Sequence, residues 1–178
     1  MTVEKVCFKR WIAALLLGLG AVAMAQEPTS WKQSKDDDPL HGKMHDKFIL
    51  SGKYLTPPRA VSQGFEPSIV VSCYEGKVEQ NYISVGAVVV KNTQTSLYPV
   101  RIEARLDDKK TSLLGDHIST DGLAVFFTRV DLRNILKAHR VILGVNEYLG
   151  PEVVMQFDMP DAAPVLDKCG KDRILKAK

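Results

Sequence analysis

The stretch "YPVRIEARLD", residues 98–107, decides the fold class. Apolar and charged side chains alternate along it from Tyr98 onward. The charged ones are Arg101, Glu103, Arg105 and Asp107, and the apolar ones that alternate with them are Val100, Ile102, Ala104 and Leu106. A period of two is typical of an antiparallel strand with one face on the core and the other in water. The stretch therefore predicts a half-buried strand.

Six further segments are short, rich in Val, Ile, Phe and Tyr, and bounded by Gly, Pro, Asn or Asp, as strands are. They are "FILSG" (48–52), "PSIVVSCY" (67–74), "NYISVGAVVV" (81–90), "GLAVFFTRV" (122–130), "RVILGVNEY" (140–148) and "PEVVMQFDM" (151–159). The prediction is a mainly β domain, a β-rich α+β fold, built as an antiparallel sandwich or a strongly twisted sheet of about seven strands. The run at 85–90 is apolar on both faces, so we expect it to lie centrally.

Turns and helices complete the outline. "YEGK" (74–77) and "DDKK" (107–110) are typical of hairpin turns. "VDLRNILKAH" (130–139) has apolar residues at helical spacing and predicts one amphipathic helix, packed on the sheet between the fifth and sixth strands, with Asp131 as its N-cap. A short C-terminal helix is predicted within "DAAPVLDKCG" (161–170), where Pro164 is compatible only with the first turn or a break.

The N-terminus, residues 1–25, has the pattern of a secretory signal peptide. Lys5, Lys9 and Arg10 precede a fifteen-residue uncharged run that ends in Ala23-Met24-Ala25. An uncleaved anchor is the alternative, but spanning a bilayer takes roughly 20 apolar residues. We expect a mature chain from Gln26, periplasmic or secreted, with a flexible polar segment at 26–35. No later run is long enough to span a membrane, so the mature chain is not expected to be membrane-embedded.

Charge and cysteine content follow from that cleavage. The signal removes a net +2 of the formal +3, and a near-neutral mature chain does not favour a nucleic-acid partner. Cys7 would leave with the signal, and Cys73 and Cys169 would remain in an oxidising compartment. One disulfide between them is the prediction, and two separately buried thiols are the alternative.

Seven segments in order carry a family resemblance: "SKDDDPLHGK" (34–43), "PSIVVSCYEGK" (67–77), "YISVG" (82–86), "VRIEARLDDKK" (100–110), "STDGLAVFF" (119–127), "ILKAHRVILGVNEY" (135–148) and "MQFDMPDAAPVLDKCG" (155–170). Together they resemble the VasI/TagO-like proteins, exported accessory factors associated with type VI secretion, over about residues 31–170. The positions that match the family's motifs are Trp31, Ser34, Asp38, Pro39, Leu40 (where the family has Met), Gly42, Cys73, Ser119, Thr120, Asp121, Gly122 and Cys169.

The resemblance implies a periplasmic accessory role, gives no known catalytic residues and supports the same cysteine pair. It also implies one β-rich domain over residues 36–170, followed by a basic tail at 171–178. Residues Asp38 to Gly42 would then form a tight turn that leads into the first strand at Phe48. The chain departs from the family in "LLGDHI" (113–118), which lacks a tryptophan, and in "DDKK", which lacks a glycine. Both departures concern a partner surface more than the fold.

A metal site is the sharpest alternative for the acidic N-terminal stretch. Its candidate ligands are Asp36, Asp37, Asp38, His41 and His45. Pro39 and Gly42 disfavour a helix there, and in an extended chain the two imidazoles would lie roughly 13 Å apart, too far for one ion. We therefore predict a solvated turn, and neither a metal nor a cofactor.

"HISTDG" (117–122) is the only clustered set of residues that suggests catalysis, and Asp116, His117 and Asp121 would be the candidates of a hydrolase. Catalytic triads come from distant segments, and the G-x-S-x-G elbow is missing. Asp121 and Gly122 favour a turn instead, with Ser119 and Thr120 bonding to loop amides.

The function that the sequence favours is that of a non-enzymatic exported domain that holds another envelope protein or a cell-wall component. The charged row Arg101, Glu103 and Arg105 is the candidate interaction face. A periplasmic hydrolase, and a stand-alone structural domain with no secretion link, are the alternatives.

Overall fold

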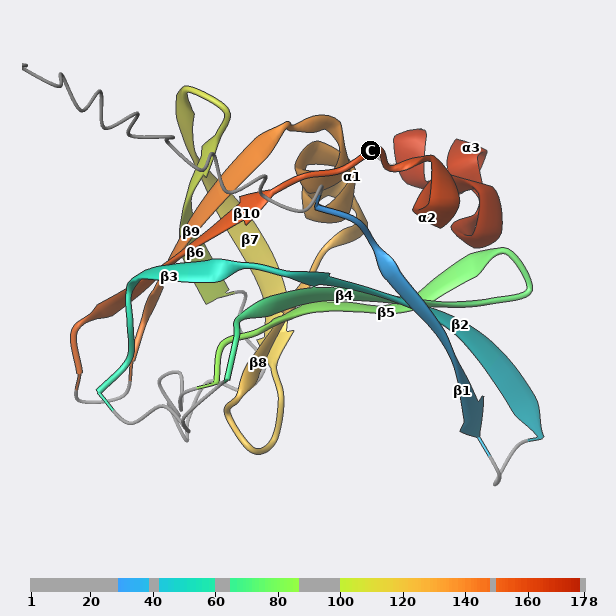
Figure 1. The fold of residues 1–178 in the computed structure, drawn as a ribbon, viewed down its shortest axis with the longest axis horizontal. Helices are drawn as coiled ribbons and strands as arrows, with labels where there is room; N and C mark the ends of the chain where they lie inside the picture. The colour runs from blue at the N-terminus through green and yellow to red at the C-terminus, as the bar shows by residue number, and fades with distance from the viewer. Residues whose placement is uncertain (1–28, 39–41, 60–64, 87–99, 148–149, 177–178) are drawn as a thin grey trace, which may run out of the picture.

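One antiparallel sheet dominates the computed structural model, which describes residues 29–38, 42–59, 65–86, 100–147 and 150–176. Within these ranges the sheet has ten strands in the order β1-β2-β4-β5-β8-β7-β6-β9-β10-β3 (Figure 1). The strands are β1 (Lys32–Asp38), β2 (Lys43–Ser51), β3 (Lys53–Thr56), β4 (Ser68–Tyr74), β5 (Lys77–Ser84), β6 (Val100–Leu106), β7 (Lys109–Ile118), β8 (Ala124–Phe127), β9 (Arg140–Asn146) and β10 (Glu152–Asp158). The helices are α1 (Arg129–Lys137), α2 (Ala163–Cys169) and α3 (Lys171–Leu175).

The mainly β, antiparallel class is confirmed, and each of the seven predicted strands overlaps an observed one. The sandwich and the strand number need correction, because the described strands form a single curled sheet, half of a barrel in shape, and β1, β3 and β7 were not predicted. Of the run predicted to lie centrally, Val85 is fully buried and residues 87–90 lie outside the described ranges. Tyr98 and the signal peptide also lie outside them.

β2 and β3 are two halves of one bent strand. β2 pairs with β4 near one edge of the sheet, whereas β3 pairs with β10 and forms the other edge. Gly52 lies between them, and a Cβ there would stand 2.5 Å from the Phe157 ring and 2.6 Å from the Gln156 carbonyl oxygen. Such distances leave no room for a side chain. The bend at Gly52 therefore joins the two ends of the curled sheet.

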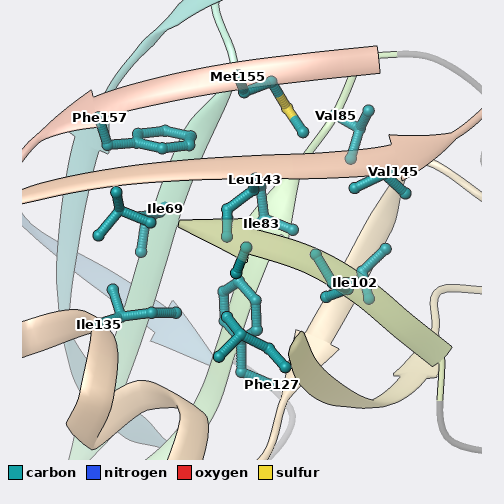
Figure 2. Packing of buried hydrophobic residues seen from close by; sticks show 14 of the residues in the cluster. Ile69, Ile83, Val85, Ile102, Phe127, Ile135, Leu143, Val145, Met155 and Phe157 are labelled. Atoms are coloured by element: carbon teal, nitrogen blue, oxygen red, sulfur yellow. The ribbon is translucent and has the colours of Figure 1, made fainter. Parts of the chain in front are cut away.

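The core fills the inside of this curl (Figure 2). Its largest fully buried side chains come from many strands and from α1, and they include Leu50, Ile69, Ile83, Ile102, Leu113, Ile135, Leu143, Met155 and Phe157. A second cluster lies between the helices and β2 and β4, made of Phe48, Val71, Cys73, Leu132, Leu136, Val165, Cys169 and Ile174. The three helices therefore pack on the core side of the sheet.

The helix between the fifth and sixth predicted strands is confirmed as α1, but its N-cap is Thr128 and not Asp131. The Thr128 hydroxyl oxygen accepts from the Asp131 amide at 3.1 Å, and the hydroxyl donates to the Asp131 carboxylate at 2.6 Å. Asp131 is thus the third helical residue of a reciprocal cap. The short C-terminal helix is confirmed as α2, with a proline in its first turn.

Both ends of the predicted domain also need correction. The segment predicted to be flexible, residues 26–35, includes Trp31, which packs against both core clusters, and the first residues of β1. The first strand therefore begins at Lys32 and not at Phe48. The segment predicted as a basic tail contains α3, because Ile174 is buried in the helical cluster. A polar edge strand and a single buried isoleucine leave little apolar periodicity for a sequence pattern to show.

The predicted hairpin turns are observed. Glu75 and Gly76 both have positive φ angles, 48° and 69°, as a two-residue hairpin turn requires. Asp107 has a φ of 53°. Gly42, with a φ of 62°, ends the connection between β1 and β2, and Pro39 to His41 of the predicted turn lie outside the described residues. Within the described part of the chain, no helix has the length and apolar character to cross a membrane.

Candidate functional site

The charged row predicted on β6 lies on the side of the sheet away from the core. Ile102 and Ala104 are buried, and Arg101, Glu103 and Arg105 between them are exposed. The half-buried strand is therefore confirmed. Glu103 forms an exposed ion pair with Lys110 of β7, with 3.5 Å between Oε2 and Nζ. Such exposed pairs contribute little stability, so the row is available for other contacts.

An aromatic row continues this side of the sheet across β5, β8 and β7. Tyr82 and Phe126 are paired across neighbouring strands, with ring centroids 5.2 Å apart. The His117 ring stacks on Phe126 with centroids 4.2 Å apart and planes inclined by 10°. Tyr82 and Phe126 alternate in sequence with buried Ile83, Val125 and Phe127. They therefore point away from the core.

A β-bulge places His117 on this row. Gly115 pairs with Phe127 and Ile118 pairs with Val125, so Asp116 and His117 together oppose the single residue Phe126. Bulges of this kind redirect a side chain and often lie beside functional sites. Asp116 holds the imidazole in place, because its carboxylate lies 2.9 Å from His117 Nδ1.

Leu114 connects the aromatic row to the charged row. It pairs with Arg101 of β6, and 55% of its surface is exposed. We call this combined surface the outer face, and its residues are Tyr82, Phe126, His117, Leu114, Arg101, Glu103 and Arg105. Tyr82 and Phe126 are partly exposed and the other five residues are exposed. Aromatic, leucine and arginine side chains mixed on one accessible surface are typical of binding sites for other molecules.

The predicted turn at residues 119–122 is observed as the β7–β8 connection. The Ser119 hydroxyl donates to the Asp121 carboxylate at 2.5 Å and accepts from the Ala124 amide at 2.9 Å. The same carboxylate accepts from the Leu123 amide at 3.0 Å, and Gly122 has a φ of 76°. Ser119, Asp121 and Gly122 thus tie down the loop, while the Thr120 side chain is exposed.

The hydrolase candidates fall into two separate pairs. Asp116 pairs with His117, and Asp121 pairs with Ser119. Because the Ser119 proton is directed at Asp121, the imidazole does not receive it in this arrangement. Ser119 and Asp121 fasten the loop, Asp116 and His117 belong to the partly exposed aromatic row, and the four do not assemble a nucleophile with its base.

Two carboxylates in the loops have pKa values below their ordinary 3.8. The backbone amides of Arg140 and His139 lower the pKa of Asp107, which links the β6–β7 turn to the start of β9. The Ser119 hydroxyl, and then a backbone amide, lower the pKa of Asp121. In both cases the hydrogen bonds favour the charged form.

We expect these two carboxylates to make the protein sensitive to acid. Because folding lowers both pKa values, their stabilisation is complete above pH 3.8 and is lost as the pH falls through the lower folded values. Asp107→Asn/Asp121→Asn should therefore have a urea midpoint that falls less steeply between pH 5 and pH 2 (roughly the range that carboxylates titrate). Asp167→Asn, at an exposed site on α2, controls for lost charge. Equal slopes in all three proteins would contradict the expectation.

The predicted cysteine pair is observed as a disulfide. Cys73 of β4 and Cys169 of α2 are bonded across 96 residues, with Cα atoms 5.3 Å apart. Both are buried in the helical cluster, so the bond fastens α2 and the α3 that follows it to the sheet. The prediction of a disulfide is confirmed over the alternative of two separate thiols.

The acidic N-terminal stretch is a charged edge strand in its described part. Asp36 pairs with Lys47 of β2 at 3.3 Å, and His45 Nδ1 lies 3.3 Å from the Glu79 carboxylate. Among the residues that the structure describes, no three His, Cys, Asp or Glu side chains gather as metal ligands would. Charges on an edge strand discourage pairing with other chains, which is a sufficient role for this stretch.

Compared with known proteins, the chain matches no protein family, no curated protein and no solved structure. The resemblance to VasI/TagO-like proteins therefore stays a prediction.

Sequence reasoning singled out the charged row and the residues around His117, and it missed Tyr82, Phe126 and Leu114. A signal for them exists in the sequence. "GLAVFFTRV" carries large apolar residues at both alternating positions, although a strand at a solvated surface needs them at one only. Adjacent residues of a strand point to opposite faces, so one of the two aromatics must lie away from the core, and here it is Phe126, because Phe127 is buried.

Proposed function

We propose that this chain is an exported, non-enzymatic accessory domain of the bacterial cell envelope, and that its outer face holds another envelope protein. The signal-like N-terminus and the sequence resemblance to type VI secretion-associated proteins support the location and the accessory role. A mature chain from Gln26 in the periplasm or outside the cell is part of the proposal.

The outer face is the single observation that carries the binding role. Phe126 lies between Tyr82 and His117, and Leu114 is more than half exposed beside Arg101. Among the described residues the helices pack on the other side of the sheet, so they leave this surface open. Aromatic and arginine side chains contribute most of the affinity at protein interfaces, and a rigid sheet holds them without loss of backbone entropy.

The disulfide supports the proposed compartment. Disulfides persist in the periplasm and outside the cell, and they are rare in the cytosol. The pair Cys73 and Cys169 closes a loop that includes most of the sheet. A fold fastened in this way keeps the outer face intact outside the cytosol.

Site-specific crosslinking in the native envelope tests the proposal. A photo-reactive phenylalanine analogue at position 114 should capture one defined envelope protein, and the same analogue at position 167 on α2 should not. Phe126→Ala should reduce the yield at position 114 by about tenfold or more, because it removes the centre of the aromatic row. The purified partner should bind the purified protein with the same dependence on Phe126.

Three results would contradict this function. One is the absence of a partner specific to position 114, and another is capture that does not change in Phe126→Ala. The third is hydrolysis of peptidoglycan or an ester that disappears in His117→Ala, which would move the protein to the enzyme class. A glycan captured at position 114 would keep the outer face as a binding site and replace the protein partner by a cell-wall component.

A further inference from the structure

A cavity of about 260 Å³ lies beside the disulfide, away from the outer face. It is formed by the start of β5, the start of α1 and the α2–α3 segment, and its lining residues are Lys77, Val78, Arg129, Cys169, Arg173 and Ile174. The apolar part of its wall includes two buried residues, Cys169 and Ile174. Val78 and three cationic side chains complete the lining, which contains no carboxylate.

The three cations form no ion pair within the described part of the chain. Lys77, Arg129 and Arg173 form none of the ion pairs found among these residues. The carboxylate next to Arg173, Asp172, pairs instead with Lys176 at 3.4 Å. Like charges gathered around one cavity repel each other, and a bound anion would remove that repulsion.

The fold holds these cations together although they come from distant parts of the sequence. The disulfide fastens Cys169 to β4, the strand that precedes Lys77 across the hairpin turn. Gly170, with a φ of 83°, packs so tightly that a Cβ there would lie 2.5 Å from the carbonyl oxygen of Gly76. The α2–α3 junction is therefore seated on the β4–β5 turn, which brings Arg173 and Lys77 to one cavity.

We propose that this cavity binds a phosphate group carried on a small organic or lipid moiety. Arginine presents several N–H donors in a planar fork that matches phosphate oxygens, and lysine adds a mobile point charge. Three cations suit a doubly charged phosphate better than a single carboxylate. Val78 and Ile174 offer an apolar surface to the carbon part of an ester. A second hollow of about 400 Å³ shares Arg173 and is also lined by Glu75 and Asp172, so it suits an uncharged or cationic remainder of the molecule.

Titration calorimetry of the purified, oxidised protein tests this site, with inorganic phosphate and glycerol phosphate as probes. Arg129→Gln and Arg173→Gln should each weaken binding by about tenfold, because each removes a charge-assisted hydrogen-bond donor. Arg101→Gln on the outer face is the matched control, and it should bind as the wild type does. If either arginine variant does not fold, Lys77→Gln, at an exposed hairpin position of the same cavity, replaces it in the test.

Vesicles separate the two sources of the phosphate group. Flotation with phosphatidic acid, a phosphomonoester, in phosphatidylcholine, lost in Arg173→Gln and kept in Arg101→Gln, would identify a lipid headgroup. Heat from the soluble probes with the same dependence would identify a free phosphate ester. The proposal is overturned if none of the three probes binds, or if Arg101→Gln weakens binding as much as the pocket variants do. It stands apart from the proposed function, because the pocket variants should leave crosslinking at position 114 unchanged.

Discussion

Reduction of the Cys73–Cys169 disulfide is expected to lower the free energy of unfolding by about 4 to 5 kcal/mol. The bond joins residues that are 96 apart in sequence, and opening it releases the loop-closure entropy of the unfolded chain. Domains have a total stability of about 5 to 15 kcal/mol, so this loss would be a large fraction of the total. Urea unfolding with and without reductant measures the change.

A double variant controls for the reductant itself. Cys73→Ala/Cys169→Ala should unfold at low urea under both conditions, because it lacks the bond in either case. If thiol labelling shows that the wild-type bond is open and the urea midpoint has not moved, the disulfide does not stabilise the fold. Reduction should also weaken phosphate binding, since Cys169 and Arg173 belong to the segment that the bond fastens.

Phe157→Ala is expected to cost about 3 to 5 kcal/mol of unfolding free energy. The Phe157 side chain is fully buried in the main cluster (Figure 2). Its ring lies against the bend at Gly52. Removing the ring leaves a cavity where the two ends of the sheet are joined. The protein should therefore lose both packing energy and the closure of the curl. Chemical denaturation gives the magnitude.

Phe126→Ala is the matched comparison, since it makes the same change on the outer face. Phe126 is only partly buried, and its truncation removes the ring contacts with Tyr82 and His117, so the cost should be smaller, about 1 kcal/mol. Phe126→Ala should lose partner capture while it keeps its fold. Phe157→Ala should instead have its larger effect on the free energy of unfolding. Equal destabilisation by the two changes would mean that the outer face is part of a core.

The strands that were predicted are those in which apolar residues recur every second position and reach the core. β6 shows this pattern most clearly, with Ile102 and Ala104 buried between exposed charges. β1 was missed because its pairing with β2 depends on backbone hydrogen bonds, and its side chains give no apolar signal. β7 was missed because its first four residues are exposed and only Leu113 and Gly115 are buried.

The candidate site was predicted in its polar half only. Arg101, Glu103 and Arg105 were singled out because alternation marks the exposed side of a strand. The stacking of His117 on Phe126 depends on the bulge in β7, and a one-residue shift in register has no signature in the sequence. The phosphate cavity combines residues from β5, α1 and α3, and only the folded chain brings them together.

The bend at Gly52 also determines when the chain can fold. Tyr54 in β3 pairs with Met155 in β10, so the sheet closes only after nearly the whole sequence is available. Pairings between distant residues slow folding, because the entropy of closing a long loop is lost before the contacts form. A growing chain that lacks β10 and Cys169 should therefore stay open. Under the export that we propose for this chain, such late closure would keep it competent for transport before its disulfide forms.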